Sequence, residues 1–330
     1  MGLGYPRLPQ IKMDHHELIG FQREFFRSGS TTGLKWRKSA LTRLRNLIAD
    51  HEAEWKSALY HDFGKSGFET YTTELGPCLQ EIDHIRRHLE SWMAPRAVST
   101  NQLIHFWSRA KIEFQPKGQV LIICPWNYPL YLLFPPLAGA LAAGCTAIVK
   151  PSENLPNTSA LTNKLVAAYF DKTEVCVVEG NAECARSLLK LDWDHIFFTG
   201  STQVGKRIME SASKSLSSIT LELGGKCPVF IDESANLKVA ARRLAWGKLV
   251  NAGQTCVAPD HIWVHQNVAS HFVSLLKEEL QKQYRQLGED YCRIIHKTAF
   301  ERLLKLGEHP SAWKAGPADE EKLHLPPVLL

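Results

Sequence analysis

Cys256 is the residue of this 330-residue sequence whose surroundings best suit nucleophilic chemistry. It lies in the loop NAGQTCVAP, residues 251–259, where small neighbours leave room for a substrate beside the thiol. A nucleophilic cysteine needs thiolate character and partial exposure. A structural role is the default for any one of the eight cysteines, but the Gly-Gln-Thr neighbours set Cys256 apart. The others lie in expected strands or helices and form no CxxC pair, which is typical of free thiols in a reducing compartment.

Two polar residues in other motifs have the chemistry to assist such a nucleophile. Asn127 lies between two prolines in CPWNYPL, residues 124–130, and a rigid amide there could donate to an oxyanion or simply shape the turn. Glu222 lies in the apolar run ITLELGGK, residues 219–226. Burial would raise the pKa of this carboxylate and suit it to general-base catalysis. The alternative is a glutamate at a sheet edge whose oxygens accept from backbone donors.

A glycine-rich turn in FFTGSTQVGKR, residues 197–207, predicts a phosphate site. A strand leads into Gly200 and a helix starts after it, so free backbone N–H groups and the helix dipole favour an anion. The string GSTQVGK nearly matches the GxxxxGK pattern of P-loops, but Arg207 stands where Ser or Thr would hold Mg²⁺. The pattern therefore suits a dinucleotide pyrophosphate better than ATP hydrolysis, although a turn that only caps the helix remains open.

Lys150 and Glu153 close another strand, in TAIVKPSE, residues 146–153. Ligands of open α/β sheets bind outside the carboxyl ends of strands. A lysine and a glutamate at that position can donate to and accept from ribose hydroxyls. The alternative interpretation is a solvated charge pair on a loop.

The elements that must position these residues alternate between strands and helices from Val120 onward. Short apolar runs such as VLIIC, TAIVK, EVCVVEG and HIFFTG are separated by helical patterns, which predicts a parallel sheet with helices on both faces. Residues 14–94 have helical periodicity, residues 104–118 alternate like a strand, and the tail at 308–330 is weakly patterned. The uncharged stretch 118–149 is long enough for a bilayer, but its prolines and its polar turn predict a buried strand–helix–strand unit instead.

The composition favours a globular protein, with 44% hydrophobic residues, 22% charged residues and a net charge of +5. These values argue against disorder, collagen and coiled coil. The charge is mild and forms no long Lys/Arg block, so we expect no nucleic-acid partner. The start, MGLGYPRLPQIKMDHHE, has no apolar leader, so we expect a cytoplasmic protein, and the scattered cysteines predict no metal site.

Taken in this order, the five motifs resemble the aldehyde dehydrogenase superfamily, and PWNYPLYL and NAGQTCVAPD look most like its class 3 branch of fatty and aromatic aldehyde dehydrogenases. The resemblance covers roughly residues 14–306. It implies an α/β fold with a Rossmann-type parallel sheet, a partial α/β catalytic domain and a β-hairpin flap. In those terms, residues 1–95 and 117–225 form a dinucleotide-binding domain, 96–116 an oligomerisation hairpin, and 226–330 the partial catalytic domain.

The resemblance also implies roles for the catalytic residues. Cys256 attacks an aldehyde to give a thiohemiacetal, the Asn127 amide and the Cys256 backbone N–H stabilise the oxyanion, and loss of hydride gives a thioester. Glu222 then activates the water that hydrolyses it. The expected substrate is a small apolar aldehyde, aliphatic or aromatic, although Tyr71, Trp126 and Tyr131 fit an apolar tunnel and core packing equally well.

On the cofactor side, the resemblance implies NAD, with NADP also accepted. Lys150 and Glu153 match the adenosine ribose contacts, Gly200 and Ser201 the pyrophosphate turn, and Gly205 the close approach of the helix. Trp126 and Gly224 complete the expected cofactor site.

The sequence departs from the family pattern after PPVLL, residues 326–330, because nothing matches the family's EEIFGP segment or the strands that follow it. The resemblance implies a homodimer, and this departure puts the dimer and the activity in doubt. A truncated remnant that at most binds the nucleotide is therefore the alternative prediction, and a P-loop-like nucleotide hydrolase is a weaker one.

Overall fold

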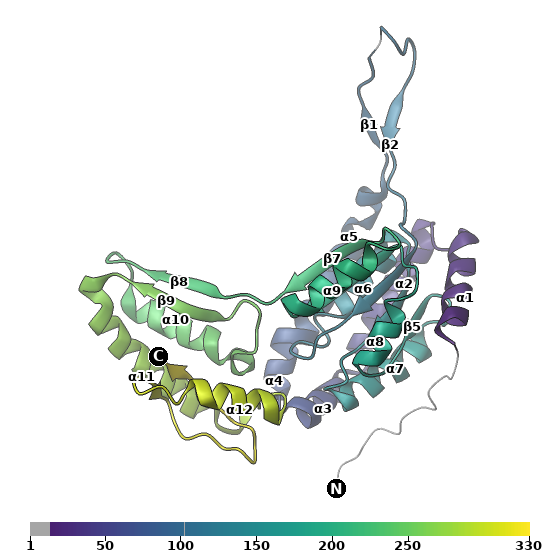
Figure 1. The fold of residues 1–330 in the computed structure, drawn as a ribbon. Coiled ribbons are helices and arrows are strands. Elements are labelled where there is room, and N and C mark those ends of the chain that lie inside the picture. The colour runs from purple at the N-terminus through teal and green to yellow at the C-terminus, as the bar shows by residue number, and fades with distance from the viewer. Residues whose placement is uncertain (1–13, 102) are drawn as a thin grey trace.

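The centre of the protein is a five-stranded sheet in which every neighbouring pair is parallel (Figure 1). The computed structural model describes residues 14–101 and 103–330, so the statements made above about residues 1–13 lie outside the described residues. The strand order is β5-β4-β3-β6-β7. The strands are β3 (Gln119–Ile123), β4 (Thr146–Lys150), β5 (Val175–Val177), β6 (His195–Gly200) and β7 (Ser218–Leu223). The predicted α/β fold is confirmed.

Helices cover both faces of this sheet because alternate strand residues point to opposite sides. In β3, Val120 and Ile122 belong to one hydrophobic core, whereas Leu121 and Ile123 belong to another. The helices of the first core are α2 (Leu34–Ala49), α3 (Glu52–Phe63), α5 (Gly76–Met93), α6 (Phe134–Ala143) and α7 (Pro156–Tyr169). The helices of the second core are α1 (His15–Arg27), α8 (Ala182–Leu188) and α9 (Thr202–Ala212).

The predicted helical region at 14–94 is helical, with three interruptions. Turns separate α1 from α2 at residues 28–33 and α2 from α3 at residues 50–51. The third interruption is at 64–66, where α3 ends at Gly64, whose φ of 66° is left-handed. The short α4 (Gly67–Thr70) and the π-helical turn η1 (Tyr71–Leu75) precede α5 without a gap. A π turn inside a helical run often marks a functional position.

The prediction of a strand throughout 104–118 is wrong in extent. Only β2 (Ala110–Ile112) is a strand, and it pairs antiparallel with β1 (Arg96–Val98) in a hairpin that projects away from the body (Figure 1). Backbone hydrogen bonds from Ile104 and His105 to Asn101 form a turn instead. Among the described residues, β1 and β2 form a sheet of two strands.

A second body follows β7, with its own core between a short parallel pair of strands and two helices (Figure 1). Phe272 and Leu276 are buried at its centre. Its elements are β8 (Cys227–Ile231), α10 (Leu237–Leu249), η2 (Val250–Gly253), β9 (Pro259–Val264), α11 (Gln266–Leu287), η3 (Gly288–Asp290) and α12 (Lys297–Leu306). The weakly patterned tail forms β10 (Trp313–Lys314) and β11 (Val328–Leu329), which pair antiparallel.

The uncharged stretch 118–149 forms β3, α6 and β4, as predicted. Both strands are buried along their whole length. Within the described residues, no helix has the length and the apolar character needed to cross a membrane.

Candidate active site

The carboxyl ends of β3, β4, β6 and β7 share one edge of the sheet, and this edge collects the predicted motifs. Lys150 ends β4 opposite Ile123, and Gly200 ends β6 opposite Leu223. From β3 the chain adds β4 and β5 on one side and then β6 and β7 on the other. Such a reversal leaves a crevice for a ligand at the carboxyl ends of the strands.

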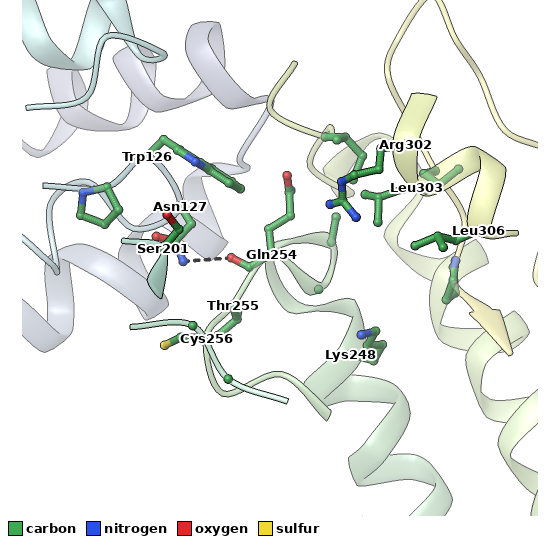
Figure 2. Close-up of a pocket in the computed structure, with 18 of the residues that line it drawn as sticks. Trp126, Asn127, Ser201, Lys248, Gln254, Thr255, Cys256, Arg302, Leu303 and Leu306 are labelled. Atoms are coloured by element: carbon green, nitrogen blue, oxygen red, sulfur yellow. Dashed lines mark hydrogen bonds between the residues drawn. The ribbon is translucent and has the colours of Figure 1, made fainter. Parts of the chain in front are cut away.

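A cavity of about 540 Å³ opens at this edge, between the sheet and the second body (Figure 2). The predicted site residues that line it are Trp126, Asn127, Gly200, Ser201, Glu222, Gly224 and Cys256. Lys150, Glu153 and Gly205 are not part of its lining. The structure therefore brings the three predicted catalytic residues to one cavity, and separates the predicted adenosine contacts from it.

Cys256 lines this cavity and is exposed. All eight cysteines lie within the described residues, and Cys256 is the one that is exposed. Burial raises the pKa of the Cys78, Cys124 and Cys292 thiols well above the ordinary value, as expected for structural cysteines. Exposure thus distinguishes Cys256 in the way its small neighbours predict.

The loop before Cys256 is held in an unusual left-handed bend. Asn251, Ala252 and Gly253 have φ values of 54°, 51° and 76°. Two successive non-glycine residues in this region cost roughly 1–2 kcal/mol each. Asn251 is fully buried and offsets that cost with hydrogen bonds to Glu69 and to the carbonyls of Asn127 and Gln254. These contacts fix the approach to the nucleophile.

Asn127 points its amide at this loop. Its Nδ2 donates to the carbonyl oxygen of Gln254 at 3.1 Å (Figure 2). One hydrogen of the Asn127 amide is thus bonded to the residue two positions before Cys256. The second amide hydrogen is left for another acceptor. The arrangement is compatible with an oxyanion donor and excludes an Asn127 side chain that only shapes its own turn.

Glu222 corrects the expectation of a buried carboxylate. It is the penultimate residue of β7, which is the edge strand of the sheet, and it is exposed. The expected burial of this carboxylate is therefore wrong. Glu222 still borders the cavity and is accessible to water, so its position fits a base acting on a water molecule.

The glycine turn has the close contacts that its predicted role requires. A Cβ at Gly200 would lie 2.4 Å from the Phe198 ring, and one at Gly205 would lie 2.9 Å from the Leu223 side chain. Helix α9 thus packs tightly on the sheet, while the Ser201 hydroxyl caps its first turn by accepting from the Val204 N–H. The N-terminus of α9 opens on the crevice, where an anion is favoured.

Lys150 and Glu153 form an ion pair of 2.9 Å in which the lysine is buried and the glutamate is exposed. Burial acts to raise the pKa of Glu153, but the hydrogen bond and charge of Lys150 outweigh it and hold the pKa below its ordinary value. A buried ammonium is unlike the solvated pair that we considered as the alternative. Both polar groups remain at the carboxyl end of β4.

Gly225, and not Gly224, makes the close approach to the nucleophile loop. A Cβ at Gly224 would meet nothing within 4 Å, whereas one at Gly225 would lie 2.8 Å from the carbonyl oxygen of Cys256. No sequence pattern separates two adjacent glycines, because the contact comes from a segment about thirty residues away.

Several cavity residues escaped the sequence analysis. Lys248 of α10 and Arg302, Leu303 and Leu306 of α12 line the side opposite Trp126 (Figure 2). Burial lowers the pKa of Lys248, against the opposing charge of Asp260. These residues lie on amphipathic helices, where a cation is usually solvated, so periodicity gave no reason to choose them. Of the aromatic residues proposed for a tunnel, only Trp126 lines the cavity.

The comparisons with known proteins agree with this geometry. The sequence model of the aldehyde dehydrogenase family matches residues 12–313, and the chain belongs to that family. A 4,4'-diaponeurosporen-aldehyde dehydrogenase of Staphylococcus aureus (strain NCTC 8325 / PS 47) is 41% identical over 313 residues, which are 93% of this chain and 68% of the relative. Aldehyde dehydrogenase family 3 member A2 of Macaca fascicularis is 40% identical, over 93% of this chain and 64% of the relative.

Among solved structures, the substrate-bound state of Staphylococcus aureus AldH matches with a TM-score of 0.92 and 40% identity, over 96% of this chain and 70% of that one. The chain spans about two thirds of the length of these curated relatives. The class 3 resemblance is confirmed, and the comparisons favour it over the P-loop interpretation.

Proposed function

We propose that the protein oxidises an aldehyde to a carboxylic acid with NAD(P)⁺ as the hydride acceptor, through a covalent intermediate on Cys256. One observation carries the proposal: the exposed Cys256 lines the same cavity as Asn127 and Glu222. A covalent intermediate divides one difficult step into two easier ones.

The residues of the chain then act in sequence. The Cys256 sulfur bonds to the carbonyl carbon, and the free N–H of the Asn127 amide, with the Cys256 backbone N–H, stabilises the negative oxygen. Nicotinamide, when bound, supplies the chemistry of hydride acceptance, which leaves an acyl group on Cys256 as a thioester. Glu222 removes a proton from water, which attacks the thioester carbon and releases the acid and the thiol.

The residues present fit a dinucleotide. The close packing at Gly200 and Gly205 and the open N-terminus of α9 suit a pyrophosphate. Lys150 and Glu153 would hold the adenosine ribose, with Trp126 and Gly224 further along the crevice. Among the fold relatives, betaine aldehyde dehydrogenase of Staphylococcus aureus was solved with NAD⁺, at 23% identity and a TM-score of 0.83. The exposed Glu153 carboxylate favours a free 2′-hydroxyl and therefore NAD, with NADP as the second choice.

The proposed substrate class is an apolar aldehyde, aliphatic or aromatic. Leu132, Ile294, Leu303 and Leu306 line the cavity and give it a mainly apolar wall. The Staphylococcus aureus relative is named for 4,4'-diaponeurosporen-aldehyde, and a relative in Cytobacillus firmus, 37% identical, is named a 4,4'-diapolycopene-4,4'-dial dehydrogenase. A series of aldehydes of increasing chain length tests this choice.

We also propose the division into a dinucleotide-binding part (1–95 and 117–225), a hairpin (96–116) and a catalytic part (226–330). The hairpin exposes Leu103, Ile104, Phe106 and Trp107 at its tip, which supports a contact with a second copy. Light scattering of the purified chain would show a dimer, and deletion of the tip would give a monomer.

The direct test of the function is turnover. The protein is mixed with NAD⁺ or NADP⁺ and a medium-chain or aromatic aldehyde, and the absorbance of the reduced nicotinamide is followed. We expect turnover by the wild type and none by Cys256→Ser, with Cys184→Ser, which lies outside the cavity lining, as the cysteine control. Activity that survives Cys256→Ser would disprove the role of Cys256.

A further inference from the structure

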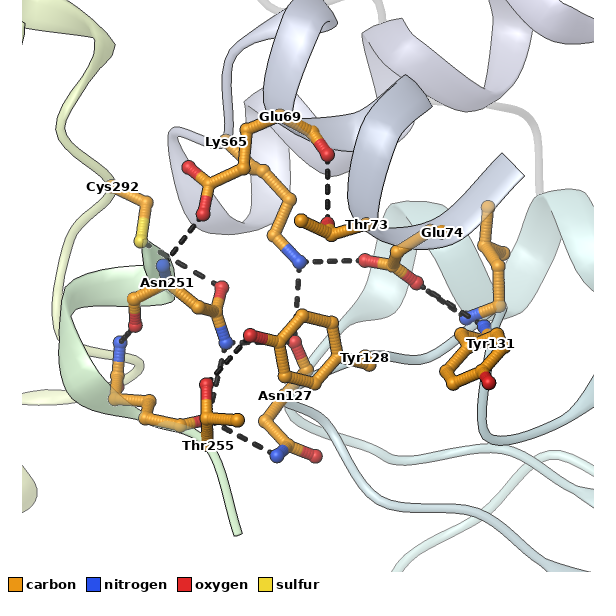
Figure 3. Close-up of polar contacts among 12 residues, drawn as sticks. Lys65, Glu69, Thr73, Glu74, Asn127, Tyr128, Tyr131, Asn251, Thr255 and Cys292 are labelled. Atoms are coloured by element: carbon orange, nitrogen blue, oxygen red, sulfur yellow. Dashed lines mark hydrogen bonds and ion pairs between the residues drawn. The ribbon is translucent and has the colours of Figure 1, made fainter. Parts of the chain in front are cut away.

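The least exposed ion pair near the active site joins Lys65 and Glu74, whose side chains are both completely buried. The Lys65 Nζ lies 2.6 Å from the Glu74 carboxylate (Figure 3). Removing two charges from water is costly, and an apolar pair of similar volume often gives equal or greater stability. We therefore look for the role of this pair in the groups that it contacts.

Lys65 holds the backbone of the residue proposed to stabilise the oxyanion. Its ammonium donates to the main-chain carbonyl oxygen of Asn127 at 3.2 Å and lies 4.5 Å above the ring of Tyr128. The Asn251 amide donates to the same carbonyl at 3.0 Å. Two donors from different parts of the chain therefore fix the Asn127 peptide group (Figure 3).

Glu74 holds the other end of the same turn. Its second carboxylate oxygen accepts from the backbone N–H of Leu130 at 2.8 Å and of Tyr131 at 3.4 Å. The ion pair therefore hydrogen-bonds to the segment 127–131 at both ends. Because these hydrogen bonds fix the backbone, they determine where the Asn127 side chain can point.

Neighbouring residues connect the Lys65–Glu74 pair to the loop that carries Cys256. Glu69, one turn before Glu74, accepts from the Asn251 N–H at 2.6 Å. The Tyr128 hydroxyl shares a hydrogen bond of 2.6 Å with the Thr255 hydroxyl, next to Cys256. The segment 65–74 thus contacts both sides of the gap between the proposed oxyanion donor and the proposed nucleophile.

We propose that Lys65, paired with Glu74, is a positioning residue that sets the Asn127 amide against the Cys256 loop. It touches no reacting atom and acts through the carbonyl of Asn127. The proposal deepens the proposed function and rests on the role given there to Asn127.

The test compares Lys65→Met with the double variant Lys65→Met/Glu74→Leu. The single variant leaves an unpaired buried carboxylate, so its loss of stability is expected and uninformative about positioning. The double variant removes both charges but leaves the Leu130 and Tyr131 N–H groups without their acceptor, so it should unfold at a denaturant concentration between those of Lys65→Met and the wild type. Lys38→Met, which breaks the exposed pair with Glu90, is the matched control.

We expect the double variant to lower kcat by about a hundredfold with little change in KM, as for loss of an oxyanion donor. In an Asn127→Ala background the same change should have no further effect, because the two residues act through one group. Hydrogen exchange should be faster in the peptide 250–256, which neither substitution touches, and unchanged in Lys38→Met.

Three results would overturn the proposal. The first is a folded double variant with the kcat and the hydrogen exchange of the wild type. The second is a further fall in kcat when the double substitution is added to Asn127→Ala, and the third is a double variant as unstable as Lys65→Met, which would make the pair structural. If the wild type shows no turnover, the proposed function fails. The exchange of peptide 250–256 then still decides whether Lys65 and Glu74 hold the loop.

Discussion

Alanine at Gly225 should displace the nucleophile loop without disturbing the fold. The new Cβ would lie 2.8 Å from the Cys256 carbonyl oxygen, whereas ordinary contact begins at 3.4 Å. The loop must therefore retreat by about 0.6 Å. A misplacement of 1 Å can cost about a hundredfold in rate, so we expect kcat/KM to fall between about tenfold and a hundredfold.

The control is Gly33→Ala, because a Cβ at Gly33 meets nothing within 4 Å and Gly33 does not line the cavity. Both alanine variants would be assayed for aldehyde-dependent reduction of NAD⁺ and for the midpoint of urea unfolding. We expect similar midpoints and a loss of turnover in Gly225→Ala alone. Equal turnover in the two variants would refute the claim that the placement of Cys256 depends on this contact.

Three further changes test the fold and its pH dependence. Gly118→Ala should destabilise by about 1–3 kcal/mol in urea unfolding, because φ is 136° and the Cβ would lie 2.1 Å from the Asp194 carboxylate. Phe272→Ala should cost about 3–5 kcal/mol in the same assay, because this fully buried ring fills the core of the second body. Glu153 has a lowered pKa, so its pairing with Lys150 stabilises the protein above its ordinary pKa of 4.5 and is lost as the pH falls. The wild type should therefore lose stability more steeply on acidification than Glu153→Gln, and parallel curves would contradict this.

The parallel sheet could be predicted from the sequence because each of its strands is a short apolar run between helical patterns. The predicted helix start after Gly200 is confirmed, and Ser201 is its N-cap, a position that serine favours. The shared edge that unites Asn127, Gly200 and Glu222 follows directly from parallel pairing.

The environment of Glu222 could not be predicted in the same way. An apolar run predicts a strand but does not say whether the strand lies at the edge or the centre of the sheet, and β7 lies at the edge. The Lys65–Glu74 pair was missed because charged residues were expected to be exposed, whereas these two are buried. Charged residues in a helical pattern are usually solvated, and only the packing of distant segments buries these two completely.

The central claim is that Cys256 carries the acyl group and that Glu222 releases it. Its most direct test is the intact and peptide mass of the Glu222→Gln variant after incubation with NAD⁺ and an apolar aldehyde. Without the base that activates water, the acyl group should accumulate as a thioester on the peptide that contains Cys256. An unmodified protein, or an acyl group on another cysteine, would contradict the account.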